Sequence, residues 1–263
     1  MPRLVTIRPR SLVRPHRFAG VAIAGAPHPC ALRRLVLTIV AIVTWPALLP
    51  AAIPAGYAGK AFEDAVAPAR PQSIPGVVAC AHYDQGGEGS AYHDTDAVNN
   101  GSGKLNPANG TYLNEFRMKE GVDTSYTKYR DDIDRHPFNK VQPPDGLLYV
   151  GWTEPGEWFN LTVSVAEAGP YTVDILYTAA RDAEIALELN GEAVAPRIQI
   201  PSTADAAEPI RWRNWHHWDL LPAAATVPLP QGVSVLTVRI VAVGNINLAT
   251  LAFRRVSADA ASR

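Results

Sequence analysis

Cysteine is scarce in this sequence, and neither sign of charge is in excess. Only Cys30 and Cys80 are present, which excludes a fold held by several disulfides. Lys and Arg total 24 against 25 Asp and Glu, so the basic excess of a nucleic-acid-binding surface is missing. No segment has a long amphipathic helical stripe. The 263 residues are nevertheless 47% hydrophobic, enough for a sizeable core.

The first 58 residues have the pattern of an export signal. Seven arginines crowd the start, an apolar run covers 35–53, and small residues follow up to Ala58. This order predicts a secretory signal peptide over 1–58, cleaved near Ala58, and a secreted, periplasmic or cell-surface protein. The alternative is an uncleaved membrane anchor, since the run is about long enough to span a bilayer, although prolines interrupt it. Cleavage removes Cys30 and leaves Cys80 as a small buried hydrophobic residue.

Composition divides the rest of the chain into three parts. Residues 59–73 are small, polar and contain prolines, and we interpret them as a linker. A folded domain is expected over 74–256, followed by a tail at 257–263. Within the domain, 93–145 is polar and rich in Asn, Asp, Gly and Pro. A loop region of this length is usually functional or disordered, and we expect ordered loops with one short strand near 112–118.

Strand signals are dense in the second half of the chain. Apolar and polar residues alternate with a period of two, and turn residues separate the runs. Asn190-Gly191 predicts a tight hairpin turn. Strands are expected at 171–177, 185–189, 194–200, 233–243 and 247–256. This spacing predicts an all-β fold, an antiparallel β-sandwich.

Several short motifs resemble carbohydrate-binding module family 6 and the related family 35. Ile74-Pro75-Gly76 and the Tyr83–Gly89 segment resemble the start of such modules. The segment at 150–158, VGWTEPGEW, resembles their VGW…GEW pattern, and Ala168–Val173 resembles their AG-x-Y turn. Asn247-Leu248 resembles the closing strand. Together the motifs cover 74–256, and the resemblance implies a galactose-binding-like jelly roll.

The resemblance also implies non-catalytic binding of a polysaccharide or oligosaccharide in loops at one end of the sandwich. In such sites two aromatic rings cover the apolar face of a sugar, and an asparagine binds its hydroxyls. By position, Trp152 and Trp212 take the aromatic places and Asn247 the amide place. Glu157 and Tyr92 lie in loops that border the site. The structural alternatives are core packing for Trp152 and a turn held by the side chain of Asn247.

Other aromatic and histidine residues are expected to serve the fold. We place Trp158, Trp215 and Trp218 in the core. His216 and His217 are expected on a strand, where adjacent side chains point to opposite faces, so that joint metal binding is disfavoured. One of the two histidines should be partly buried, and the other should line the loop end.

The usual calcium site of these modules lacks its ligands here. Family members hold this ion with two glutamates in the first strand and an aspartate after the closing Asn-Leu, where this chain has Ala79-Cys80-Ala81 and Ala249. Because Ca²⁺ needs several oxygen ligands, we expect no structural calcium and no other cofactor. Asp94-Thr95-Asp96, with Asn99 and Asn100, faintly resembles a calcium loop but has no closing Glu. We interpret this segment as an Asx-rich turn.

Catalysis is not indicated by any motif in the sequence. No H-E-x-x-H, G-x-S-x-G or paired-cysteine pattern occurs. Glycosidases use two carboxylates, but Glu154 and Glu157, three residues apart on one turn, should crowd one edge. We therefore predict a non-enzymatic carbohydrate-binding protein. The alternatives are a structural or adhesive jelly roll without a sugar site, and a small glycoside hydrolase that uses the 93–145 loops.

Overall fold

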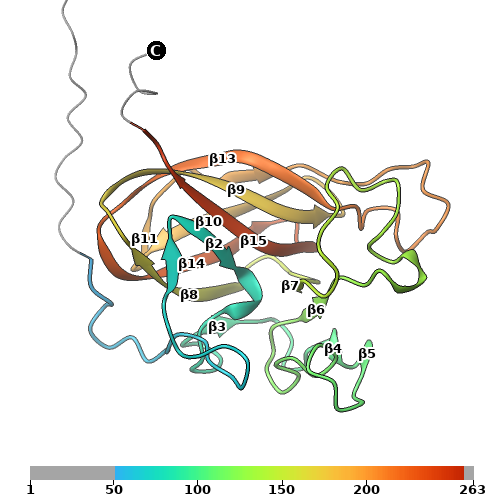
Figure 1. The fold of residues 1–263 in the computed structure, drawn as a ribbon, viewed down its shortest axis with the longest axis horizontal. Coiled ribbons are helices and arrows are strands. Elements are labelled where there is room, and N and C mark those ends of the chain that lie inside the picture. The colour runs from blue at the N-terminus through green and yellow to red at the C-terminus, as the bar shows by residue number, and fades with distance from the viewer. Residues whose placement is uncertain (1–50, 258–263) are drawn as a thin grey trace, which may run out of the picture. The chain divides into compact units, whose positions relative to one another are not determined.

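Two stacked sheets enclose one hydrophobic core in the computed structural model, which describes residues 51–257 (Figure 1). The first sheet has the order β1 (Gln72–Ile74), β8 (Trp158–Val165), β14 (Gly232–Ala242), β10 (Ala183–Leu189) and β11 (Glu192–Ala193), with β12 (Ile198–Ile200) beside β10 and β3 (Tyr92–His93) beside β8. The second has the order β13 (Asp219–Leu229), β9 (Gly169–Ala179), β15 (Ile246–Arg255), β7 (Leu148–Val150) and β6 (Thr124–Tyr126), with β2 (Gly76–Ala79) beside β15.

Short elements complete the described part of the chain. The strands β4 (Ser102–Gly103) and β5 (Asn106–Pro107) form a separate parallel pair. The two 3-10 turns, η1 (Cys80–His82) and η2 (Arg130–Asp132), are the helical segments within residues 51–257. Within the two large sheets every pairing is antiparallel except that of β1 with β8. The predicted antiparallel β-sandwich is confirmed.

Alternating hydrophobicity explains why these strands form and which way they face. In β10, Ile185, Leu187 and Leu189 are buried, whereas Ala186 and Glu188 are half-buried. The period of two therefore directs one face of the strand into the core. Burying each such aliphatic side chain stabilises the fold by roughly 1.5–3 kcal/mol. The same core cluster takes residues from both sheets, so the sheets are held together by their inner faces.

The hairpin predicted at Asn190-Gly191 is confirmed. Both residues have positive φ, 53° and 87°, which is the backbone that a type I′ turn requires. Leu189 pairs with Glu192 across the turn. The expected return strand at 194–200 is only partly correct, because the chain leaves the sheet after β11 and pairs again with β10 at β12.

The strand expected at 112–118 is wrong. The backbone there makes local turns: the Glu115 N–H donates to the Thr111 carbonyl and the Met118 N–H to Glu115. Groups satisfied locally are not available to a sheet ladder. The next strand along the chain is β6, at 124–126, which pairs with β7.

The segment expected to be a linker packs against the sandwich. Phe62 is buried against Ala81 and Phe116, and Lys60 exchanges backbone hydrogen bonds with Gln85. An aromatic side chain in an otherwise polar stretch provides the contact. Most of the predicted signal and tail lies outside the described residues. No helix within 51–257 is long and apolar enough to cross a bilayer.

Candidate functional site

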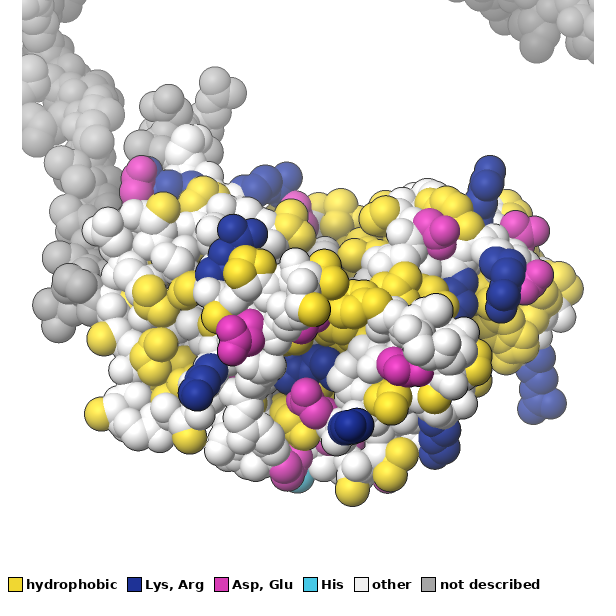
Figure 2. All heavy atoms as spheres, turned by 60° about the horizontal axis from the view of Figure 1, so that its bottom comes forward, with side chains coloured by type: hydrophobic (Ala, Val, Ile, Leu, Met, Phe, Trp, Pro, Cys, Tyr) yellow, Lys and Arg dark blue, Asp and Glu magenta, His cyan; other side chains and the backbone are white. Residues whose placement is uncertain are grey.

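A groove of about 670 Å³ lies beside the β4–β5 pair and two long loops, 127–147 and 201–218. On the face that carries β4 and β5, hydrophobic side chains gather in a hollow between projecting parts of the surface (Figure 2). We call this the aromatic groove. Its lining consists of Leu105, Asn106, Pro107, Asn109, Asn114, Tyr126, Lys128, Tyr129, Arg130, Ile133, Asp145 and Trp212.

Trp212 is the most exposed aromatic side chain of the groove, with 57% of its surface accessible. Its neighbour Arg213 is buried and anchors the turn. The guanidinium of Arg213 donates to both carboxylate oxygens of Glu208, at 2.9 and 3.1 Å, and to the Asp132 carbonyl at 2.6 Å. These bonds fix the chain at Arg213, directly after Trp212, whose indole lies exposed at the surface.

Two tyrosines bring further aromatic surface to the same groove. The Tyr126 hydroxyl donates to Asn114 Oδ1 at 2.8 Å, and the Tyr129 hydroxyl donates to the Pro143 carbonyl at 2.6 Å. Lys128 Nζ lies 4.2 Å from the centre of the Tyr126 ring, a cation–π contact. Because their hydroxyls are bound, the rings are held in place. Sequence reasoning missed both tyrosines, although Tyr126 ends the short strand β6 and Tyr129 follows it in a long polar region.

Amides and one carboxylate supply polarity in the aromatic groove. Asn106 donates to Ser125 Oγ at 3.2 Å, and Asn114 donates to Asn109 Oδ1 at 3.0 Å. Asp145 accepts the Tyr129 N–H at 2.9 Å. A few oriented polar groups among apolar walls are typical of a site for a small molecule or a short polymer.

A second, more polar groove of about 450 Å³ contains Trp152 and Glu157. We call this the acidic groove. Trp152 follows β7 with a left-handed backbone, φ 49°, and its ring stacks at 6.5 Å on that of Tyr149. The positive φ costs roughly 1–2 kcal/mol for a residue with a side chain. The lining consists of Asp94, Thr95, Asp96, Asn100, Asp123, Trp152, Thr153, Glu154, Pro155, Glu157, Arg181, Gly244 and Asn245.

Negative charge is crowded in the acidic groove. Burial, followed by the charges of Glu157 and Asp123, raises the pKa of Asp94 to about 7. Burial, together with the charges of Glu157 and Asp96, likewise raises the pKa of Asp123 to about 6, although hydrogen bonds from Asn100 oppose the shift. The Asp96 N–H donates to Asp94 Oδ1 at 2.9 Å, which is the predicted Asx turn.

Glu154 and Glu157 lie on one edge of the acidic groove. Thr95 Oγ1 is 2.7 Å from Glu157 Oε1 and 3.2 Å from Glu154 Oε2, and the Glu154 N–H donates to Glu157 Oε2 at 2.7 Å. Glu157 is buried, and its carboxylate is taken up by these contacts. The two carboxylates share the Thr95 hydroxyl and crowd one edge of the groove, and it is the crowding that their spacing in the sequence predicted.

Asn247 and Tyr92 lie beneath the surface. Asn247 is 2% exposed, and its amide nitrogen is 2.8 Å from Thr178 Oγ1 and 2.9 Å from His216 Nδ1. The Tyr92 hydroxyl accepts the Gly121 N–H at 3.2 Å. The five residues predicted for one site are therefore divided: Trp212 lines one groove, Trp152 and Glu157 line another, and Asn247 and Tyr92 serve the interior.

Of the three tryptophans expected in the core, one is there. Trp218 is fully buried and packs with Tyr149 and Ala249. Trp158 and Trp215 are only half-buried, so that prediction is wrong for them. Trp158 begins β8 beside His93, and the guanidinium of Arg239 lies 5.9 Å from the centre of its ring.

The histidine pair lies in a different place from the one predicted, but its two side chains do point to different partners, as expected. His216 and His217 lie in the loop before β13, not on a strand, and both are buried. His216 Nε2 is 2.7 Å from Asp134 Oδ1. His217 Nδ1 is 2.8 Å from the carbonyl of Thr203. The two rings therefore take different partners.

Small residues and one amide fill the region where the resemblance implies calcium. Gln72 Oε1 accepts the Ala79 N–H at 2.7 Å, and Gln72 Nε2 donates to the Ala79 carbonyl at 3.2 Å. Ala249 is fully buried against Tyr149 and Trp218. Cys80 is also fully buried, as predicted, and burial raises the pKa of its thiol well above the usual range. A side-chain amide thus satisfies backbone groups here.

No family model and no curated protein sequence match this chain. Similar solved structures include the family 6 module CsCBM6-3 of Clostridium stercorarium in complex with cellobiose. It is 12% identical with a TM-score of 0.44, over 71% of this chain and 98% of that one. A family 35 module of Clostridium thermocellum is 19% identical with a TM-score of 0.35, over 45% and 84% of the two chains.

A third similar structure is a larger enzyme. The isomaltodextranase of Arthrobacter globiformis T6, complexed with panose, is 18% identical with a TM-score of 0.34. The match covers 44% of this chain and 20% of that one. The similar structures thus include carbohydrate-binding modules of families 6 and 35, each at low sequence identity and with a TM-score below 0.5.

Proposed function

We propose that the aromatic groove binds carbohydrate and that the protein acts by binding, without catalysis. The observation that carries this proposal is the exposed indole of Trp212 in a groove shared with Tyr126 and Tyr129. A sugar ring has an apolar C–H face, which a flat aromatic ring covers at little cost in side-chain entropy. Neighbouring amides both donate and accept hydrogen bonds, which suits the hydroxyl rim.

The carboxylates of the two grooves support binding without hydrolysis. Glycoside hydrolysis commonly uses two carboxyl groups that flank the bond. Within the described lining of the aromatic groove, Asp145 is the one carboxylate, and it accepts the Tyr129 N–H. In the acidic groove, Glu154 and Glu157 meet at one hydroxyl on the same edge. The pair considered from the sequence, Glu154 and Glu157, therefore lies on one edge and not across the groove, whose lining also includes Asp94, Asp96 and Asp123.

Affinity electrophoresis tests the proposal. The full chain is run through gels that contain xylan, β-glucan, mannan or agarose, with an acidic polysaccharide added because Lys128 and Arg130 line the groove. Cellobiose and panose, named with two of the similar structures, serve as soluble competitors. We expect retardation in at least one gel. Unretarded migration in all of them contradicts the proposal and favours a structural or adhesive jelly roll.

Export is a separate proposal that rests on the first 58 residues. We propose cleavage near Ala58 and a location outside the cytoplasm. Expression in a secreting host, followed by N-terminal sequencing of the released protein, tests it. A new N-terminus near residue 59 is expected. A chain that stays intact in the membrane fraction contradicts cleavage and favours the anchor.

A further inference from the structure

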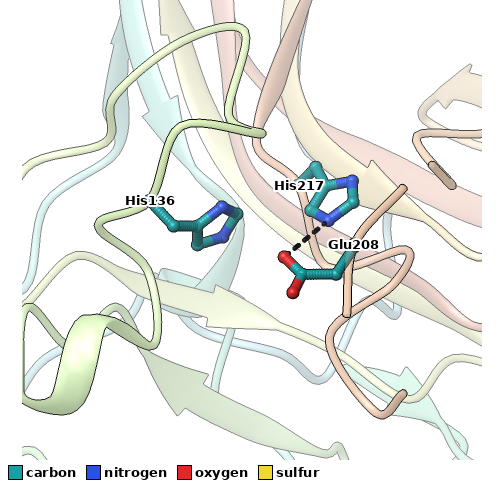
Figure 3. Close-up of side chains that lie close together, drawn as sticks. All are labelled: His136, Glu208 and His217. Atoms are coloured by element: carbon teal, nitrogen blue, oxygen red, sulfur yellow. Dashed lines mark ion pairs between the residues drawn. The ribbon is translucent and has the colours of Figure 1, made fainter. Parts of the chain in front are cut away.

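Three buried side chains converge between the two long loops that flank the aromatic groove. His136 comes from the 127–147 loop, and Glu208 and His217 come from the 201–218 loop. One nitrogen or oxygen atom from each lies within 4.8 Å of the others. The residues are 8%, 6% and 2% exposed, respectively. Figure 3 shows His136 reaching from one loop toward the other two.

The histidines in this cluster have nitrogens without a hydrogen-bond partner. Within the described chain, neither ring nitrogen of His136 is hydrogen-bonded, and neither is Nε2 of His217. His217 Nε2 is 3.6 Å from Glu208 Oε2, too far for a hydrogen bond. Buried polar atoms normally find a partner, and each exception calls for an explanation such as an ion.

The hydrogen-bond contacts of the two rings show what kind of partner is missing. His217 Nδ1 donates its proton to the Thr203 carbonyl at 2.8 Å, which leaves a lone pair on Nε2 of the neutral ring. Neither nitrogen of the His136 ring has a hydrogen-bond partner within the described chain, so that ring also offers a lone pair in its neutral form. Two lone pairs and the carboxylate of Glu208 thus meet in one place, where a cation is favoured.

The surroundings hold the ligand atoms in position. Arg213 donates to both oxygens of Glu208, at 2.9 and 3.1 Å, and each carboxylate oxygen keeps a second lone pair. The Phe138 ring stacks on that of His217 with centroids 5.3 Å apart. The Thr203 carbonyl and Arg213 therefore act as the outer hydrogen-bonding partners that orient metal ligands.

We propose that His136, Glu208 and His217 bind one divalent transition-metal ion of the zinc type. Two imidazoles and one carboxylate form a zinc ligand set that leaves a fourth position open. Bonds of about 2.1 Å in a tetrahedral site separate ligand atoms by about 3.4 Å, so side-chain movements on the order of 1 Å close the site. The ion joins the 127–147 loop to the 201–218 loop. These loops carry Tyr129 and Trp212, so an influence of the ion on sugar binding rests on the proposed function. The binding of the ion itself does not.

Metal uptake by the full chain tests this proposal. Protein without a histidine tag is treated with chelator, dialysed, and titrated with Zn²⁺ or Co²⁺. We expect one zinc per chain, the visible absorption of a tetrahedral cobalt site, and a Tm about 5–10 °C higher at a zinc concentration one hundred times the Kd. Wild-type protein that takes up no zinc overturns the proposal, whether or not the protein binds sugar.

The His136→Phe variant separates metal binding from folding. The ring nitrogens of His136 have no hydrogen bond within residues 51–257 to lose, so the metal-free variant should be as stable as the wild type or more so. Zinc affinity should fall by more than about 100-fold, since even outer-sphere changes cost 10–100-fold. His93→Gln, at an exposed histidine paired with Glu88, is the control and should bind zinc normally. Equal zinc affinity in His136→Phe overturns the proposal.

Discussion

His216 Nε2 lies 2.7 Å from Asp134 Oδ1 and joins the two long loops that flank the aromatic groove. The same carboxylate oxygen accepts the Trp218 indole N–H at 2.7 Å, and Oδ2 accepts the Lys128 N–H at 2.7 Å. On the other side of the ring, the Asn247 amide faces His216 Nδ1. One buried network therefore connects the core to both loops.

Replacing the carboxylate of this network should destabilise the fold. Burial alone raises the pKa of Asp134. The hydrogen bond and charge of His216, together with hydrogen bonds from the Trp218 indole and the Lys128 backbone N–H, outweigh burial and lower the pKa. We expect Asp134→Asn to reduce the free energy of unfolding by about 3 kcal/mol, measured by urea denaturation. Asp131→Asn, on the exposed surface of the same loop, should change it by less than about 0.5 kcal/mol. Equal effects contradict the network.

Asn247→Ala should affect stability more than sugar contact. The Asn247 amide donates within the interior, to Thr178 and toward His216, and the side chain is almost fully buried. Losing it leaves buried acceptors unpaired, at a cost of about 1–3 kcal/mol. Urea denaturation measures this loss, and calorimetry measures the affinity of the folded variant. A stable variant that no longer binds sugar contradicts this prediction and indicates that Asn247 contacts the sugar directly.

Asp94→Asn should stabilise the protein at alkaline pH. The raised pKa of Asp94, about 7, lies above the unfolded value, so the folded state binds more protons between pH 4 and 7. Stability from this group is therefore lost as the pH rises through about 7. Asparagine keeps an oxygen for the Asp96 N–H and removes the charge. Because the groove is open to screening by solvent, we expect a gain of only about 1 kcal/mol, or roughly 2–4 °C in Tm, at pH 8.

The same variant at pH 5 is the control for that prediction. Wild-type Asp94 is already largely protonated there, so wild type and variant should melt at nearly the same temperature. An equal shift at pH 5 and pH 8 would mean that packing, and not charge, accounts for the gain.

Added calcium should leave the melting temperature unchanged. Ala79 and Ala249 stand where the resemblance implies carboxylate ligands, and Gln72 already binds the Ala79 backbone. Chelator-treated protein is heated with and without millimolar Ca²⁺ while unfolding is recorded. A Tm that rises by several degrees with calcium contradicts the predicted loss of this site.

The strands were predictable because their signals are local. The alternation in β10 and the Asn190-Gly191 turn set burial and turn geometry within a few residues. The loops were not, because their backbone groups bind side chains distant in the sequence, as where the Trp218 N–H donates to Asn139 Oδ1. A period of two carries no information about such contacts.

The residues of the candidate sites likewise divide into those with a local sequence signal and those brought together only by the fold. Trp212 was identified by resemblance, and it does line a groove. Its neighbours Tyr126 and Tyr129 come from a region without a regular pattern. His136, Glu208 and His217 meet only because two loops fold together. The sequence singled out His217 with its neighbour His216, but nothing in it indicated His136 or Glu208.

Calorimetry with Trp212→Ala tests sugar binding in the aromatic groove most directly. The polysaccharide that retards the wild type is titrated, as an oligosaccharide, into wild type, Trp212→Ala and the control Trp158→Ala. Trp158 is half-buried and lines neither the aromatic nor the acidic groove. Loss of one stacked ring should weaken binding by about 1–3 kcal/mol, roughly 5- to 150-fold in Kd, while Trp158→Ala binds like the wild type. Unchanged affinity in Trp212→Ala contradicts binding in this groove.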